Sequence, residues 1–110
     1  MTDRELLEYA AKAGGITGIK WHESGEGGWL DGCGAPSTWW NPLTDDGDAL
    51  RLAVKLNLQV TPGTYRSDEA TAYRAGMSEA NERVHYQQDL AAATKRAIVR
   101  AAAEIGKAML

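Results

Sequence analysis

The sequence predicts a single α+β domain over residues 1–110, a sandwich of three helices and a mainly antiparallel sheet of about four or five short strands. Apolar residues recur at helical spacing near residues 2–13, 45–57 and 90–109. Short alternating runs lie between these segments and are separated by glycine or proline turns. The positions of these segments give the order α-β-β-α-β-β-β-α. Tight turns between short strands favour antiparallel pairing.

The first helix has clear signals at both ends. Thr2 and Glu5 have the spacing of a capping box, in which each side chain caps the other residue's backbone amide. The pair Gly14-Gly15 should end the helix, because glycine adopts the left-handed conformation without strain.

A glycine-rich segment follows. Residues Ile16–Glu23 read as a strand with Ile19 and Trp21 on one face and Lys20 and His22 on the other. Trp29–Asp31 should return as the second strand of a hairpin. We expect Gly32–Ser37 to be a loop and the whole stretch from Gly25 to Pro36 to be flexible.

The densest local signal runs from Trp39 to Leu56. Pro42 keeps Asn41 extended, and Thr44 or Asp45 can cap the helix that follows. Trp39 and Trp40 should point to opposite sides of an extended chain. We expect the helix to bury a face that carries apolar residues at spacings of three and four, widened by two more leucines, and to end near Asn57; these apolar residues are Ala49, Leu50, Leu52, Ala53, Val54, Leu56 and Leu58.

Three further strands and a helix are expected beyond this point. The strands are Leu58–Thr61, Ala70–Arg74 and Glu82–Tyr86, with a weak additional pairing at Thr64–Arg66 and a turn at Gly76–Asn81. Asp89 should cap the alanine-rich last helix. Its expected buried stripe is Leu90, Thr94, Ala97, Ile98, Ala101, Ile105, Ala108 and Met109.

Bulk composition narrows the function classes. The chain has 44% hydrophobic and 25% charged residues, a net charge of −3 and a pI of about 5.3. This balance disfavours nucleic-acid binding, which needs clustered Lys and Arg. A single cysteine excludes an internal disulfide, and neither a signal sequence nor a membrane span is recognisable, so we expect a protein of the cytoplasm.

Two residue groups could support chemistry, and each has a simpler structural interpretation. Asp45, Asp46 and Asp48 could bind a cation, but they stand where a helix needs caps and lack the ligand spacing of a calcium loop. Cys33 lies between two glycines and could serve a small-molecule site or an enzyme with His22 and Asp31. No base is tied to it locally, and zinc binding with His22 and His85 lacks the usual paired ligands. We therefore assign no catalytic, cofactor-binding or metal-binding residues. Whether the protein is an enzyme stays open, and we favour a binding function over catalysis.

Two further groups could form an interaction surface. Lys95, Arg96 and Arg100 make a basic patch on the last helix, which would serve an acidic partner or nucleic acid, or would simply be solvated. Among the tryptophans, at least two should be in the core, and a remaining exposed one is the best surface candidate. The candidates are Trp29, Trp39 and Trp40.

Several segments resemble small uncharacterised bacteriophage and prophage proteins of the alpha-beta-alpha sandwich type. They are the opening residues 2–14, the run Trp40-Asn41-Pro42-Leu43-Thr44-Asp45-Asp46-Gly47-Asp48 with the helix behind it, and residues 93–106. The resemblance implies a phage origin and this fold, and it transfers no activity. We therefore expect a non-enzymatic accessory protein of the bacterial cytoplasm that binds a phage or host protein, with a homodimer left open.

Overall fold

The computed structural model describes residues 2–32, 35–62, 69–77, 80–83 and 90–109. Three helices are present, α1 (Asp3–Ala13), α2 (Asp46–Lys55) and α3 (Leu90–Ala108). The strands are β1 (Lys20–Trp21), β2 (Gly28–Gly32), β3 (Ala35–Trp40), β4 (Gln59–Thr61), β5 (Glu69–Tyr73) and β6 (Ala80–Arg83). The α+β class, the three helices and the antiparallel pairing are confirmed.

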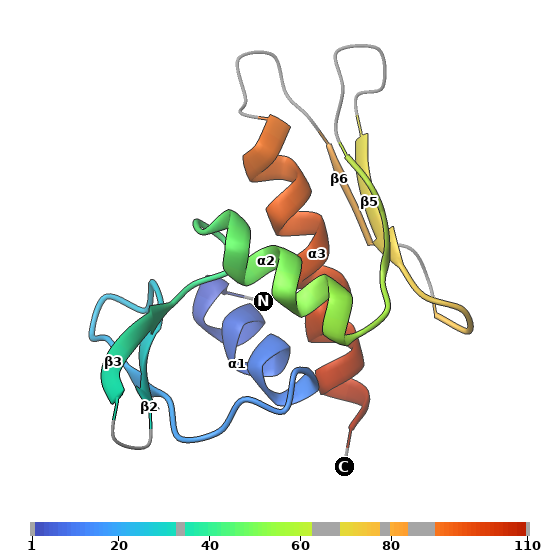
Figure 1. Cartoon of the computed structure of the whole chain (residues 1–110). Coiled ribbons are helices and arrows are strands. Elements are labelled where there is room, and N and C mark those ends of the chain that lie inside the picture. The colour runs from blue at the N-terminus through green and yellow to red at the C-terminus, as the bar shows by residue number, and fades with distance from the viewer. Residues whose placement is uncertain (1, 33–34, 63–68, 78–79, 84–89, 110) are drawn as a thin grey trace.

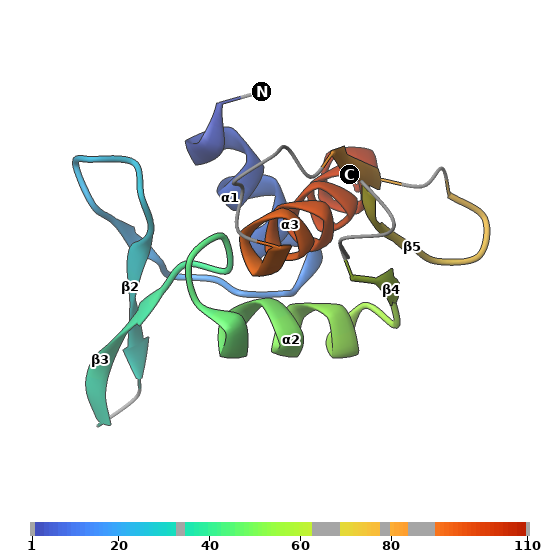
Figure 2. The ribbon, with the colours of Figure 1, turned by 90° about the horizontal axis from the view of Figure 1, so that it is seen from above.

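The strands form two separate sheets at opposite ends of the molecule. Strands β1, β2 and β3 pair in chain order to give sheet A, and β4, β5 and β6 do the same to give sheet B. The helices lie between the two sheets, and the β2–β3 ribbon projects away from them (Figures 1 and 2). The molecule is accordingly elongated, with principal extents of 46 × 32 × 23 Å.

Helix α3 is the centre of the core. It packs against α1, α2 and the β5–β6 part of sheet B. Its buried residues are small on several sides, which lets neighbouring backbones approach closely; they are Ala93, Ala97, Ile98, Val99, Ala101, Ala102, Ala103 and Gly106. The expected single stripe was too narrow, and Ala108 and Met109 at its end are exposed.

Local signals set the ends of α1 and α2 as expected. Thr2 and Glu5 form the capping box of α1, which is followed by Gly15 at φ 69°. Asn57 plays the same part after α2, at φ 55°. In both cases the two amides that follow the C-cap residue, which is Gly14 in α1 and Leu56 in α2, donate to carbonyls of the final turn, which is the Schellman arrangement.

Several boundaries differ from the sequence expectation. The strand expected at Ile16–Glu23 is reduced to β1, and the loop expected at Gly32–Ser37 is largely strand, because β2 extends to Gly32 and β3 begins at Ala35. Pairing between β2 and β3 sets the end of β2 and the start of β3, since an isolated glycine-rich segment has no strand preference of its own. The turn expected at Gly76–Asn81 gives way to β6 at Ala80.

The expected face of α2 also needs correction. Ala49, Leu52, Ala53 and Leu56 are buried, whereas Leu50 and Val54 are 64% and 71% exposed. The helix has apolar residues over more than half of its circumference, so periodicity alone could not select the side that faces α3. The expectations for Cys33, Thr64–Arg66, residues 84–86 including His85, and the Asp89 cap lie outside the described residues.

Candidate functional site

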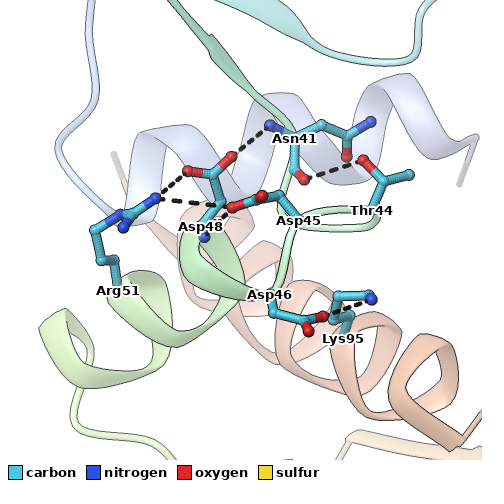
Figure 3. A network of polar contacts seen from close by, with 7 residues as sticks. All are labelled: Asn41, Thr44, Asp45, Asp46, Asp48, Arg51 and Lys95. Atoms are coloured by element: carbon cyan, nitrogen blue, oxygen red, sulfur yellow. Dashed lines mark hydrogen bonds and ion pairs between the residues drawn. The ribbon is translucent and has the colours of Figure 1, made fainter.

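The acidic run before α2 is a folding junction (Figure 3). Asp45 is the N-cap, with Oδ2 accepting from the Asp48 amide at 2.8 Å. Asp48 is only 6% exposed, and its Oδ2 accepts from the Asn41 amide at 3.0 Å while Oδ1 accepts from Arg51 Nη2 at 2.7 Å. Both of its oxygens are therefore satisfied, as a buried carboxylate requires.

Asn41 extends this junction to sheet A. Its Oδ1 accepts from the Leu43 amide at 2.9 Å, and its Nδ2 donates to the Glu26 carbonyl in the β1–β2 connection. The Asn41 carbonyl accepts from the Asp45 amide at 2.9 Å. The side chain thus ties the hairpin to the turn that starts α2.

The three carboxylates of this run divide between two cations, because Asp45 and Asp48 both lie near Arg51, at 3.8 and 2.7 Å, whereas Asp46 does not. Asp46 points away from Asp45 and Asp48 and binds Lys95 Nζ at 2.7 Å (Figure 3). Among the described residues, no three His, Cys, Asp or Glu side chains gather as a metal site would require. The placement of these acids is explained by helix capping and ion pairing.

The basic residues of α3 tie the helices together. Lys95, whose side chain is 13% exposed, reaches the first turn of α2 through Asp46. Arg96 reaches the first turn of α1 through Asp3, with Nη1 and Oδ1 3.0 Å apart. Arg100 is half-buried on the same helix. Lys95 and Arg96 therefore reach toward different helices, and each has an acidic partner within the chain.

The tryptophans of sheet A divide between its two faces. Trp40 is 3% exposed and meets the half-buried Trp21 edge to face, with ring centroids 6.2 Å apart. Trp29, 45% exposed, contacts the half-buried Trp39 in the same manner at 5.1 Å. The sheet register explains the division, because Trp29 pairs directly with Trp39 while Gly28 pairs with Trp21 and Trp40.

Gly28 lies between the inner pair and leaves room for Ile19. A Cβ at this position would lie 2.3 Å from Cγ2 of Ile19. Because glycine leaves the space empty, Ile19 covers the middle strand and the two indoles flank it. Trp40 is consequently a core residue, which removes it from the candidates for a surface site.

The outward side of sheet A carries what we call the aromatic face, made of His22, Trp29 and Trp39. The His22 ring lies 5.8 Å from the Trp39 ring, at an interplanar angle of 72°. Its Nδ1 accepts from the Ser24 amide at 3.1 Å and lies 2.9 Å from Ser24 Oγ, which fixes the ring in the turn. This face offers apolar area with polar ring edges, a composition suited to recognition.

A second surface feature was not anticipated from the sequence. An open groove of about 370 Å³ lies between α2, α3 and β4. Its apolar lining includes Ala49, Leu50, Ala53, Val60, Leu90 and Ile98, and the Lys95–Asp46 pair stands at its rim. The surplus of apolar residues around α2 was the only signal in the sequence, because the groove exists only once three distant segments meet.

Comparison of the chain with known proteins found no match. No protein-family model matches it. No curated protein and no solved structure matches it either. Within the described residues, no helix is both long enough and apolar enough to cross a lipid bilayer.

Proposed function

We propose that this protein is a phage- or prophage-encoded accessory protein that works without catalysis, by binding a phage or host protein in the bacterial cytoplasm. The phage origin rests on the resemblance of residues 2–14, 40–56 and 93–106 to such proteins. The binding role rests on the aromatic face of sheet A. The observation that carries this proposal is the exposure of Trp29, which is 45% exposed on a sheet that projects from the helical body (Figure 1).

Exposed tryptophans of this kind are effective anchors for a partner. Trp is enriched among the interface residues that carry most of the binding free energy. Trp29 is held by its edge-to-face contact with Trp39, so little side-chain freedom remains to be lost on binding. Asp46, Asp48 and Lys95, which were weighed above as parts of a cation site or a nucleic-acid surface, form the Asp48–Arg51 and Lys95–Asp46 ion pairs within the chain.

The test first captures a binding partner and then compares how tightly two variants bind it. The tagged protein is expressed in infected or lysogenic cells, and bound proteins are identified and then purified for calorimetry. Trp29→Ala should weaken binding by at least about tenfold, as expected for a hot-spot residue. Met109→Ala removes an exposed apolar side chain just after the end of α3, outside sheet A, and should leave the affinity unchanged. If every captured protein binds the Trp29 variant as well as the wild type, the proposal fails.

A further inference from the structure

A second exposed apolar surface lies on α2, apart from the aromatic face. Leu50 and Val54 are four residues apart and therefore share one side of the helix, where they are 64% and 71% exposed. Leu50 is also part of the groove lining between α2, α3 and β4. The two side chains and the groove thus form one continuous apolar surface, which we call the α2 groove.

The size of the α2 groove fits anchoring side chains. Its volume of about 370 Å³ is near the lower end of the roughly 300–1,000 Å³ found for ligand pockets. Leu50 lines the groove, and the exposed Val54 continues the apolar surface outside it, where a small ligand would leave Val54 uncovered. A protein segment that inserts one or two apolar side chains and lies over α2 would cover both parts.

The backbone around the groove favours a helical segment over an extended one. β4, which forms the edge of sheet B beside the groove, has only three residues and is followed by Pro62, which has no N–H to offer an added strand. The walls provided by α2 and α3 present side-chain ridges, against which another helix packs readily. Helix-in-groove recognition is therefore the mode that this surface supports.

Charge on the outer flank of α2 specifies the partner further. Arg51 and Lys55 follow Leu50 and Val54 by one residue each, so they form a parallel basic row. Arg51 is 72% exposed, and its Nη2 lies 2.7 Å from Asp48 Oδ1 and 3.8 Å from Asp45 Oδ2, which leaves its other guanidinium donors for a partner. Lys55 is exposed and makes no ion pair within the described part of the chain. An apolar helix with acidic residues along one flank complements this row.

We propose that the α2 groove binds an amphipathic helix of a partner protein, with apolar anchors in the groove and carboxylates against Arg51 and Lys55. The apolar contacts would supply most of the binding free energy, and the charged contacts would select the partner. It uses a surface separate from the aromatic face, so either proposal can fail without the other.

The probe is a pair of synthetic amphipathic peptides about 18 residues long with the same leucine face, one flanked by Glu and one by Lys. Fluorescence anisotropy of the labelled peptides measures binding to the full chain. The Glu-flanked peptide should bind at least about tenfold more tightly than the Lys-flanked one, with the difference shrinking at high salt. The double variant Leu50→Ser/Val54→Ser should lose at least about tenfold, and both positions are exposed, so the fold should tolerate it.

Matched variants separate this surface from others. Lys55→Glu should reduce the preference for the Glu-flanked peptide, whereas Lys107→Glu, the same charge change at an exposed site near the end of α3, should not. Trp29→Ala should bind both peptides as the wild type does. Failure of the Glu-flanked peptide to bind, or equal binding of the two peptides, overturns the proposal. Sedimentation that shows a dimer of the protein alone, abolished by Leu50→Ser, would assign the surface to a second copy and overturn it as well.

Discussion

Gly106 is the position at which one added methyl group should damage the core most. Helix α3 crosses α1 there, and a Cβ built on Gly106 would lie 1.9 Å from the Tyr9 carbonyl oxygen and 2.7 Å from its carbonyl carbon. Both atoms belong to the backbone of α1, so no side-chain rotation can relieve the contact. An ordinary contact of about 3.4 Å requires the helices to separate by about 1.5 Å at this point, the difference between 3.4 and 1.9 Å.

The expected magnitude for Gly106→Ala follows from two opposing effects. Overpacking of a well-packed core costs about 1–3 kcal/mol, and the rigid backbone contact places this site at the upper end. Alanine is about 1 kcal/mol better than glycine inside a helix. We therefore expect a net loss of about 2 kcal/mol in the free energy of unfolding, which should lower the urea midpoint by about 1 M.

Urea unfolding followed by tryptophan fluorescence measures this change. Gly47→Ala is the matched control, because its Cβ would meet only side-chain atoms, the terminal nitrogens of the exposed Arg51 at 3.1 and 3.2 Å and Asp45 Oδ2 at 3.2 Å. The Arg51 side chain can move, so we expect a change of less than about 1 kcal/mol. A Gly106→Ala midpoint equal to or above that of the wild type would show that α1 and α3 are not packed as closely as the structure has them.

Three other outcomes are expected. Asp48→Ala should lower the free energy of unfolding by about 2–3 kcal/mol in urea titrations, because it leaves the buried Asn41 amide without an acceptor. Arg51→Ala removes only the exposed partner of Asp48 and should cost less than about 1 kcal/mol, so equal losses for the two variants would contradict this expectation. Hydrogen bonds from Thr2 lower the pKa of Glu5, so its stabilisation is present above the ordinary glutamate pKa and lost as the pH falls through the lowered value. The difference in thermal midpoint between wild type and Glu5→Gln should therefore disappear in acid, and a difference independent of pH would refute it. Trp40→Ala should lower the free energy of unfolding by about 3–5 kcal/mol and weaken the near-ultraviolet circular dichroism signal of the packed tryptophans. A loss below about 1 kcal/mol would mean that this indole is not in the core.

The candidate surfaces show how far sequence reasoning reaches. Alternation along a strand placed Trp29 and Trp40 on opposite faces only after the hairpin register was known, since Gly28 pairs with Trp40 and Trp29 with Trp39. The basic patch on α3 was recognisable by its composition. Its ion pairs were not, because Asp46 and Asp3 are distant in sequence from Lys95 and Arg96.

The ends of α1 and α2 were determined by the sequence alone. The Thr2–Glu5 capping box, the Asp45 cap and the glycine and asparagine at the helix ends involve contacts over a few residues, and side-chain chemistry settles these locally. Tertiary structure decided which sides of the helices are buried. Leu50 and Val54 have the same apolar character as Leu52, yet only the direction from which α3 approaches places them at the surface. That direction depends on contacts between segments far apart in the chain, such as Gly106 against Tyr9, and no local pattern carries that information.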